Sequence, residues 1–121
     1  MRASGPIVVV DDDTDLRETL GELLAEEGYA PRCFENGRAA LEWLRGDAAD
    51  PRLILLDLMM PEMNGWQFRE AQRSDPRLKE IPVIVMTASR TLDERQIDAS
   101  EVLFKPIGLE ELLRAVERNA R

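Results

Sequence analysis

Acidic side chains follow directly on two of the apolar runs in this sequence. Asp11, Asp12 and Asp13 come after one such run, and Asp57 comes after another. Carboxylates packed together repel each other, and at ~4 Å a like-charged pair costs about 1–4 kcal/mol, depending on the effective dielectric constant. A cluster of them therefore favours a bound cation, and oxygen ligands suit a hard ion such as Mg2+.

A threonine and a lysine occupy the same position after two later apolar runs. Thr87 offers a short hydroxyl donor, and Lys105 offers a positive charge for a phosphate oxygen. An aspartate beside a metal ion, a lysine and a threonine can act as a nucleophile, since carboxylates form acyl phosphates. Phosphoryl transfer depends mainly on positioning and charge neutralisation, which these groups supply. We therefore predict that Asp57 takes up a phosphoryl group beside a metal held by Asp11 and Asp12.

Each of these residues also has an ordinary structural interpretation. Asp13 is explained at least as well by a helix cap, and Thr87 by a hydroxyl bonded to nearby backbone. The pair Lys105-Pro106 is typical of a turn, and its peptide bond can be cis. The functional interpretation depends on complementary side chains following four separate apolar runs.

These positions can meet only if the apolar runs are strands of one parallel sheet. Short runs predict strands at 7–10, 30–34, 53–56, 82–86 and 102–104. Helix-start signals and one-face apolar spacing predict helices beginning near Asp13, Asn36, Trp66 and Leu109. Strands alternating with helices imply helices on both faces of the sheet. We predict an α/β fold with a flavodoxin-like, doubly wound five-stranded parallel sheet of order 2-1-3-4-5 and five helices. Its ligand site lies beyond the carboxyl ends of the strands.

The fourth of the five predicted helices, between the strands at 82–86 and 102–104, has few apolar side chains to hold it in place. The segment from Thr91 to Ile97 is highly charged and has only Leu92 and Ile97 to bury. Because so few apolar groups offset the entropy of ordering, we predict that this helix is short or poorly ordered.

Composition excludes several classes of function. The 121 residues suit one domain, and the net charge of −8 argues against nucleic acid as a direct partner. One cysteine and no histidine exclude a disulfide framework, the usual zinc sites and the Ser-His and Cys-His catalytic pairs. No apolar run approaches the ~18 residues that span a bilayer, so we expect a cytoplasmic protein with no membrane partner. Cys33 lies in a short apolar stretch and is predicted to be buried.

Four segments, in this order and spacing, resemble the receiver domain of two-component response regulators. They are Val9–Asp12, Leu56–Gly65, Val85–Ala88 and Phe104–Pro106. The resemblance extends from Ile7 to about Ala120, so residues 1–121 are expected to form a single receiver domain with no output domain in the chain. It implies a phosphohistidine donor on a sensor histidine kinase or a histidine phosphotransfer protein. That donor would dock against the first helix and the loop after Lys105, and a downstream protein of unknown identity would read the result.

The resemblance also implies a role for each matching residue. Asp57 is the phosphoacceptor and a ligand of Mg2+ (or Mn2+), with Asp12 binding directly, Asp11 through water and Met59 through its backbone carbonyl. Thr87 and Lys105 bind the phosphoryl group, and the small Ala88 leaves it accessible. The loops around the site are shaped by Pro61, Gly65 and Pro106. The chain departs from the family at one position. The family often has an aromatic residue there that swings inward together with the threonine, whereas this chain has Val102.

Three other interpretations remain to be weighed. A degenerate receiver would act only as a binding module, whereas we expect a protein that catalyses only its own phosphorylation and dephosphorylation. A haloacid dehalogenase-type phosphatase would use Asp11 and Asp13, but it needs a threonine where this chain has Asp15 and leaves Asp57 without a role. A calcium loop is excluded because Leu16 stands where that loop requires glycine.

Overall fold

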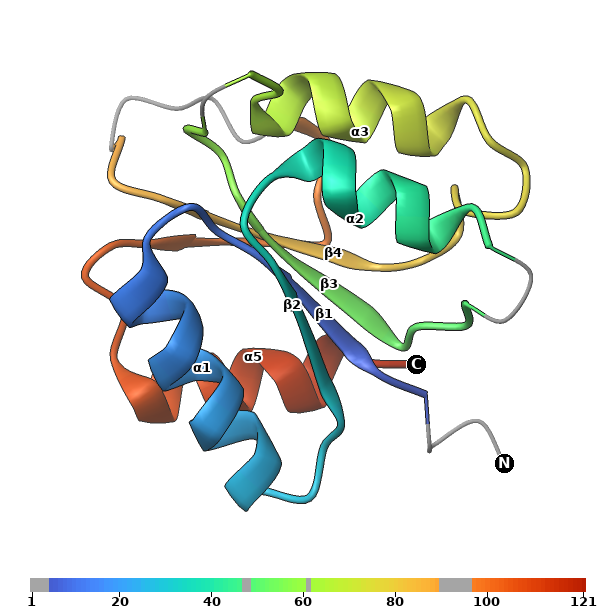
Figure 1. The fold of residues 1–121 in the computed structure, drawn as a ribbon. Coiled ribbons are helices and arrows are strands. Elements are labelled where there is room, and N and C mark those ends of the chain that lie inside the picture. The colour runs from blue at the N-terminus through green and yellow to red at the C-terminus, as the bar shows by residue number, and fades with distance from the viewer. Residues whose placement is uncertain (1–4, 47–48, 61, 90–96) are drawn as a thin grey trace.

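The computed structural model describes residues 5–46, 49–60, 62–89 and 97–121. Five strands form one sheet in the order β2-β1-β3-β4-β5, and every neighbouring pair is parallel (Figure 1). The strands are β1 Ile7–Val10, β2 Pro31–Phe34, β3 Leu53–Asp57, β4 Val83–Thr87 and β5 Glu101–Phe104. The predicted fold class and strand order are confirmed. The helices lie on both faces because apolar strands of a parallel sheet must be covered on both sides.

Four helices are assigned within these ranges, and two lie on each face of the sheet (Figure 1). They are α1 Thr14–Glu26, α2 Gly37–Leu44, α3 Gly65–Arg73 and α5 Leu109–Asn119. The prediction of a short or poorly ordered helix over 91–97 falls outside the described residues, apart from Ile97, which is buried. No helix in the described ranges has the length and apolar character needed to cross a membrane.

Side chains alternate along the strands between two separate cores. Val8 and Val10 of β1 pack on the side of α2 and α3, together with Leu44 and Phe68. The intervening residues of β1 pack on the side of α1 and α5, where the core includes Leu20, Leu24, Leu112 and Val116. Each central strand is thus buried on both faces.

The register of the sheet decides which residues share its carboxyl edge. Val10 pairs with Leu56, so the residues that follow them, Asp11 and Asp57, lie level with each other. Thr87 pairs with Phe104, so Lys105 emerges one position beyond Thr87. The four functional positions therefore lie along one edge of the sheet.

Cys33 corrects the prediction that the only cysteine is buried, because its side chain is exposed. It lies on β2, which is an edge strand of the sheet. The residue of α1 that faces it is Gly21, where an added Cβ would lie 3.4 Å from the Cys33 sulfur. Gly21 has no side chain that could cover Cys33 from α1.

Candidate functional site

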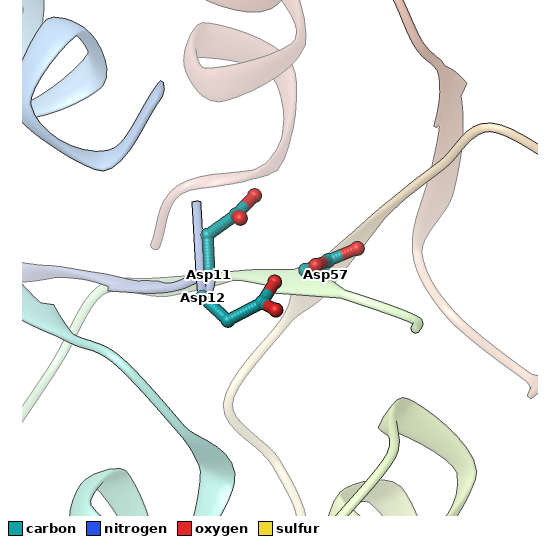
Figure 2. Close-up of side chains that lie close together, drawn as sticks. All are labelled: Asp11, Asp12 and Asp57. Atoms are coloured by element: carbon teal, nitrogen blue, oxygen red, sulfur yellow. The ribbon is translucent and has the colours of Figure 1, made fainter. Parts of the chain in front are cut away.

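Three carboxylates gather at the carboxyl edge of the sheet. Asp11 and Asp12 follow β1, and Asp57 ends β3, so the register described above brings them together (Figure 2). One oxygen from each carboxylate lies within 4.8 Å of the others. Asp11 is fully buried and Asp57 is 4% exposed, whereas Asp12 is exposed. Two acidic groups are therefore withdrawn from water and the third remains at the surface.

The Lys105 ammonium lies between the two buried carboxylates. Its Nζ is 3.2 Å from Asp11 Oδ2 and 3.4 Å from Asp57 Oδ1. Burial by itself lowers the pKa of Lys105, but the negative charges of Asp11 and Asp57 outweigh it, and the pKa is raised. Lys105 is therefore charged near neutral pH and partly offsets the two carboxylates. Its backbone is also held, because its N–H donates to the Thr87 carbonyl at 2.7 Å.

Asp57 has a strongly perturbed pKa. Burial, followed by the negative charge of Asp11, raises the pKa of Asp57 to about 6. Lys105 and the Met59 N–H, 3.4 Å from Asp57 Oδ1, oppose this shift, while the neighbouring Asp12 carboxyl adds to it. The charge of the Lys105 ammonium thus does not balance the nearby carboxylates, and the site favours an additional positive charge.

The donor set fits a hard divalent cation. Three carboxylate oxygens within 4.8 Å of one another are oxygen ligands of the type that Mg2+ prefers. Mg2+ uses one or two carboxylates and retains several waters, and the exposure of Asp12 leaves room for such waters. Met59 has its backbone N–H turned towards Asp57, but the role of its carbonyl as a ligand stays a prediction.

Thr87 ends β4 with its side chain buried. Its Oγ1 accepts a hydrogen bond from the Ser89 N–H at 3.0 Å. A hydroxyl that accepts one hydrogen bond keeps its own proton to donate. The Thr87 hydroxyl can therefore still donate a hydrogen bond, and its position is set by the backbone that follows it.

An apolar groove opens beside Lys105. It has a volume of about 420 Å³ and lies between the start of α1 and the loops after β4 and β5. Its lining consists of Asp13, Leu16, Ala88, Lys105, Pro106 and Ile107. Ala88 is exposed and contributes only a methyl group, so the approach to the pocket stays open. The Lys105-Pro106 peptide is cis.

Gly65 permits the loop after Asp57 to pack against the start of α3. A Cβ at this position would lie 2.8 Å from the Cα and 2.8 Å from Cδ1 of Leu58. The Gly65 N–H also donates to the Leu58 carbonyl at 2.8 Å. Any side chain here would push Leu58 away and disturb Asp57 beside it. Pro61, the other predicted loop-shaping residue before α3, lies outside the described residues.

Asp13 has the structural role that competed with a functional one. It is the N-cap of α1, and its Oδ1 accepts the Leu16 N–H at 3.2 Å. Its carboxylate is therefore engaged by the helix start. A phosphatase-type pair of Asp11 and Asp13 finds no support in this arrangement, since the side chain that meets Asp11 and Asp57 belongs to Lys105.

Arg17, to which the sequence pattern assigns no role, touches the site. Its Nη1 donates to the backbone carbonyl of Asp11 at 2.8 Å. A cation near the start of a helix is disfavoured by the helix dipole, and this unusual placement is the one signal in the sequence that could have drawn attention to it.

Comparison with known proteins gives a consistent assignment. The family model of the response regulator receiver domain matches residues 7–117. Response regulator MprA of Mycolicibacterium vanbaalenii is 37% identical over 111 residues, which cover 88% of this chain and 46% of that protein. The chain thus spans about half the length of this relative.

Solved structures of similar proteins have the same fold. The Vibrio cholerae chemotaxis protein CheY4 superposes with a TM-score of 0.86 at 27% identity, covering 97% of this chain and 99% of that one. Response regulator TrrA of Thermotoga maritima, determined in complex with Mg2+-BeF, gives a TM-score of 0.79 at 32% identity, covering 94% of this chain and 97% of that one. The fold, the acidic pocket and the match over 7–117 together show that this chain belongs to the response regulator receiver domain family.

Proposed function

We propose that residues 1–121 act as one receiver domain, in which Asp57 accepts a phosphoryl group from a phosphohistidine in a magnesium-dependent phosphorelay. The observation that carries this proposal is the pocket at the carboxyl edge, where three carboxylates meet and Lys105 lies within 3.4 Å of two of them. The Mg2+-BeF complex of TrrA supports it, since that relative binds a metal together with a fluoroberyllate group.

Asp57 is suited to act as the nucleophile. With a pKa of about 6, it is mostly ionised near neutral pH. One of its oxygens forms a bond to phosphorus while the bond from phosphorus to the donor imidazole nitrogen breaks, and the nitrogen keeps the electron pair. Asp11, Asp12 and the Met59 carbonyl would hold Mg2+ beside Asp57. Bound Mg2+ supplies positive charge that neutralises the phosphoryl oxygens as they transfer.

Lys105 and Thr87 would then hold the transferred group. The Lys105 ammonium, which pairs with Asp57 in this structure, is free to pair with a phosphoryl oxygen once Asp57 has become an acyl phosphate. The Thr87 hydroxyl would donate to another phosphoryl oxygen. Lys105 and Thr87 would both contact the acyl phosphate directly, so they would also influence the rate of its later hydrolysis. We propose that the protein catalyses only the phosphorylation and the dephosphorylation of its own Asp57.

The donor is expected to approach across the apolar groove beside Lys105. A sensor histidine kinase or a histidine phosphotransfer protein must bring an imidazole to Asp57, and this groove is adjacent to the pocket. Leu16, Pro106 and Ile107 offer apolar contact area, and Ala88 leaves the path open. The groove thus supports the expectation that the donor docks on the first helix and the loop after Lys105.

The downstream partner would respond to a change at Thr87. An aromatic ring at position 102 cannot transmit this change, because that residue is Val102. Val102 is half-buried on β5 and packs on the side of the sheet that carries α2 and α3. Valine has no aromatic ring that could move between an inward and an outward position. We therefore propose that the phosphorylated state is recognised through the loops around Asp57 and Thr87.

Phosphorylation by acetyl phosphate tests the proposal. The full chain is incubated with acetyl phosphate and Mg2+, and its intact mass is measured with and without EDTA. We expect a gain of one phosphoryl group that requires the metal and disappears in Asp57→Asn. The exposed Asp50 lies at the opposite end of β3, so Asp50→Asn is the matched control and should be phosphorylated normally. No gain in the wild type would favour a degenerate receiver, and a gain that persists in Asp57→Asn would exclude Asp57 as the acceptor.

A further inference from the structure

Arg17 reaches from α1 to the backbone between Asp11 and Asp12, just after β1. Its Nη1 donates to the Asp11 carbonyl at 2.8 Å, and its Nη2 lies 3.5 Å from Thr14 Oγ1. The side chain is half-buried and lines a cavity of about 170 Å³ that Asp12 also lines. The guanidinium therefore lies next to the acidic pocket while its hydrogen bond goes to the backbone of the pocket.

This contact fixes a peptide plane that carries Asp12. The peptide bond is planar, so a fixed Asp11 carbonyl also fixes the direction of the Asp12 N–H and the position of its Cα. A second contact holds the other side of the turn, since the Asp13 N–H donates to Asp11 Oδ1 at 2.9 Å. Asp12 thus lies between two held points.

Asp12 is the member of the cluster that most needs this support. Asp11 is buried and paired with Lys105, and Asp57 belongs to a central strand. Asp12 is exposed, so packing does not restrict its side chain. Its approach to Asp57 is set by the backbone of the turn, which Arg17 holds.

The placement of Arg17 has a cost that this contact explains. Its backbone N–H donates to the carbonyl of the N-cap Asp13 at 2.9 Å, so Arg17 lies at the start of α1. The positive end of the helix dipole disfavours a cation there, and ordering a long side chain costs entropy. A hydrogen bond from a charged donor to a carbonyl beside the pocket offsets both effects.

We propose that Arg17 is a positioning residue for the metal site: it holds the Asp11-Asp12 peptide so that the Asp12 carboxylate meets Asp57 and the cation. This inference rests on the proposed function, because it concerns the ligands of Mg2+. Arg17 would act through the Asp11 carbonyl and not as a ligand of the metal or the phosphoryl group.

The direction of the change in Mg2+ affinity separates positioning from simple charge. Removing a cation beside the pocket strengthens Mg2+ binding if Arg17 acts only through its charge. The same removal weakens binding if Arg17 holds the turn. Mg2+ is therefore titrated into the full-length wild type, Arg17→Met and Arg17→Lys, with backbone amide NMR shifts as the readout. Arg45→Met, at the exposed end of α2, removes the same charge away from the pocket and serves as control.

We expect the Mg2+ dissociation constant of Arg17→Met to rise at least about fivefold, in keeping with the loss of one hydrogen bond from a charged donor. Arg17→Lys keeps the charge and one donor and should fall between this variant and the wild type, and Arg45→Met should match the wild type. An unchanged or tighter midpoint in Arg17→Met overturns the inference. If Arg17→Met does not fold, a wild-type midpoint in Arg17→Lys overturns it instead. A wild type that gives no Mg2+-dependent shift refutes the proposed function and, with it, this inference.

Discussion

Replacing Asp57 by asparagine should make the metal-free protein more stable, although it removes the proposed phosphoacceptor. The pKa of Asp57 rises from 3.8 to about 6 on folding, chiefly through burial and then through Asp11. A carboxyl group with a higher pKa in the folded state binds protons preferentially in that state. Its contribution to the free energy of unfolding is therefore most favourable below pH 4 and falls as the pH rises through about 6.

The size of the effect follows from the shift. One pKa unit corresponds to about 1.36 kcal/mol, so a rise of the Asp57 pKa from 3.8 to about 6 costs the folded protein about 3 kcal/mol above pH 7 and about half of that at pH 5. Asparagine has nearly the same shape and does not ionise. We therefore expect Asp57→Asn to exceed the wild type by these amounts, with a gap that narrows as the pH falls.

Urea unfolding in EDTA, carried out from about pH 4.5 to about pH 8, measures this gap directly. The stability gap should grow over this range as Asp57 ionises. Asp50→Asn is the matched control, because Asp50 is 84% exposed in its side chain and pairs only at 3.7 Å with Arg121. It should show no gap that grows with pH. A wild type as stable as Asp57→Asn at pH 8, or a gap that does not depend on pH, would refute the reasoning about burial.

Mg2+ should reverse the order of stability. A ligand that binds only the folded state adds RT ln(1 + [L]/Kd) to the free energy of unfolding. At saturating Mg2+ the wild type should gain stability, whereas Asp57→Asn, which has lost one ligand carboxylate, should gain much less. Equal gains in the two proteins would show that Mg2+ binds elsewhere.

Three further predictions concern the residues around the site and below it. Lys105→Met should raise the pKa of Asp57 further, because Lys105 opposes the shift, and a carbon-detected NMR titration of the metal-free protein measures this. Gly65→Ala should destabilise the protein by about 1–3 kcal/mol in urea unfolding, since its Cβ would lie 2.8 Å from Leu58. Gln72→Leu should cost about 2 kcal/mol or more in the same assay, because the buried Gln72 amide donates to two backbone carbonyls before β4.

Each of these has an outcome that would contradict it. An unchanged or lower Asp57 pKa in Lys105→Met would mean that the ammonium does not interact with it. Gly21→Ala is the control for Gly65→Ala, because a Cβ at Gly21 lies no closer than 3.4 Å to its neighbour and should be tolerated. Equal effects of the two alanines, or a neutral Gln72→Leu, would refute the packing and hydrogen-bond arguments.

The sequence predicted the sheet well because its strands are buried on both faces. A run such as Ile7–Val10 has no polar position, so it suits a strand covered on both faces. The order of the strands was predicted from a different constraint, because right-handed crossovers between parallel strands leave few topologies. The meeting of Asp11, Asp57 and Lys105 then required only that the strands end level with one another. Helix caps at Asp13 and Asn36 were also readable, because capping depends on a few neighbouring residues.

Features that depend on contacts between distant elements were not readable. The exposure of Cys33 depends on the glycine that faces it from α1, and the contact of Arg17 depends on the path of the turn after β1. In α3, Arg69 and Gln72 are buried although both are polar, and Arg69 donates to the Asp98 carbonyl. A one-dimensional apolar pattern assigns such side chains to the solvent-facing side of a helix, and only the tertiary structure supplies their partners.

The Lys105 ammonium also determines which cations can compete for the pocket. Among the residues that the structure describes, the three clustered carboxylates, when ionised, and the Lys105 ammonium together leave two negative charges. A sodium or potassium ion neutralises only half of this deficit, whereas one divalent ion removes it. The pocket therefore discriminates against the abundant monovalent ions by charge balance before any difference in size or coordination geometry matters. Lys105 sets that balance, so losing its charge would leave the pocket one negative charge too many for a single divalent ion.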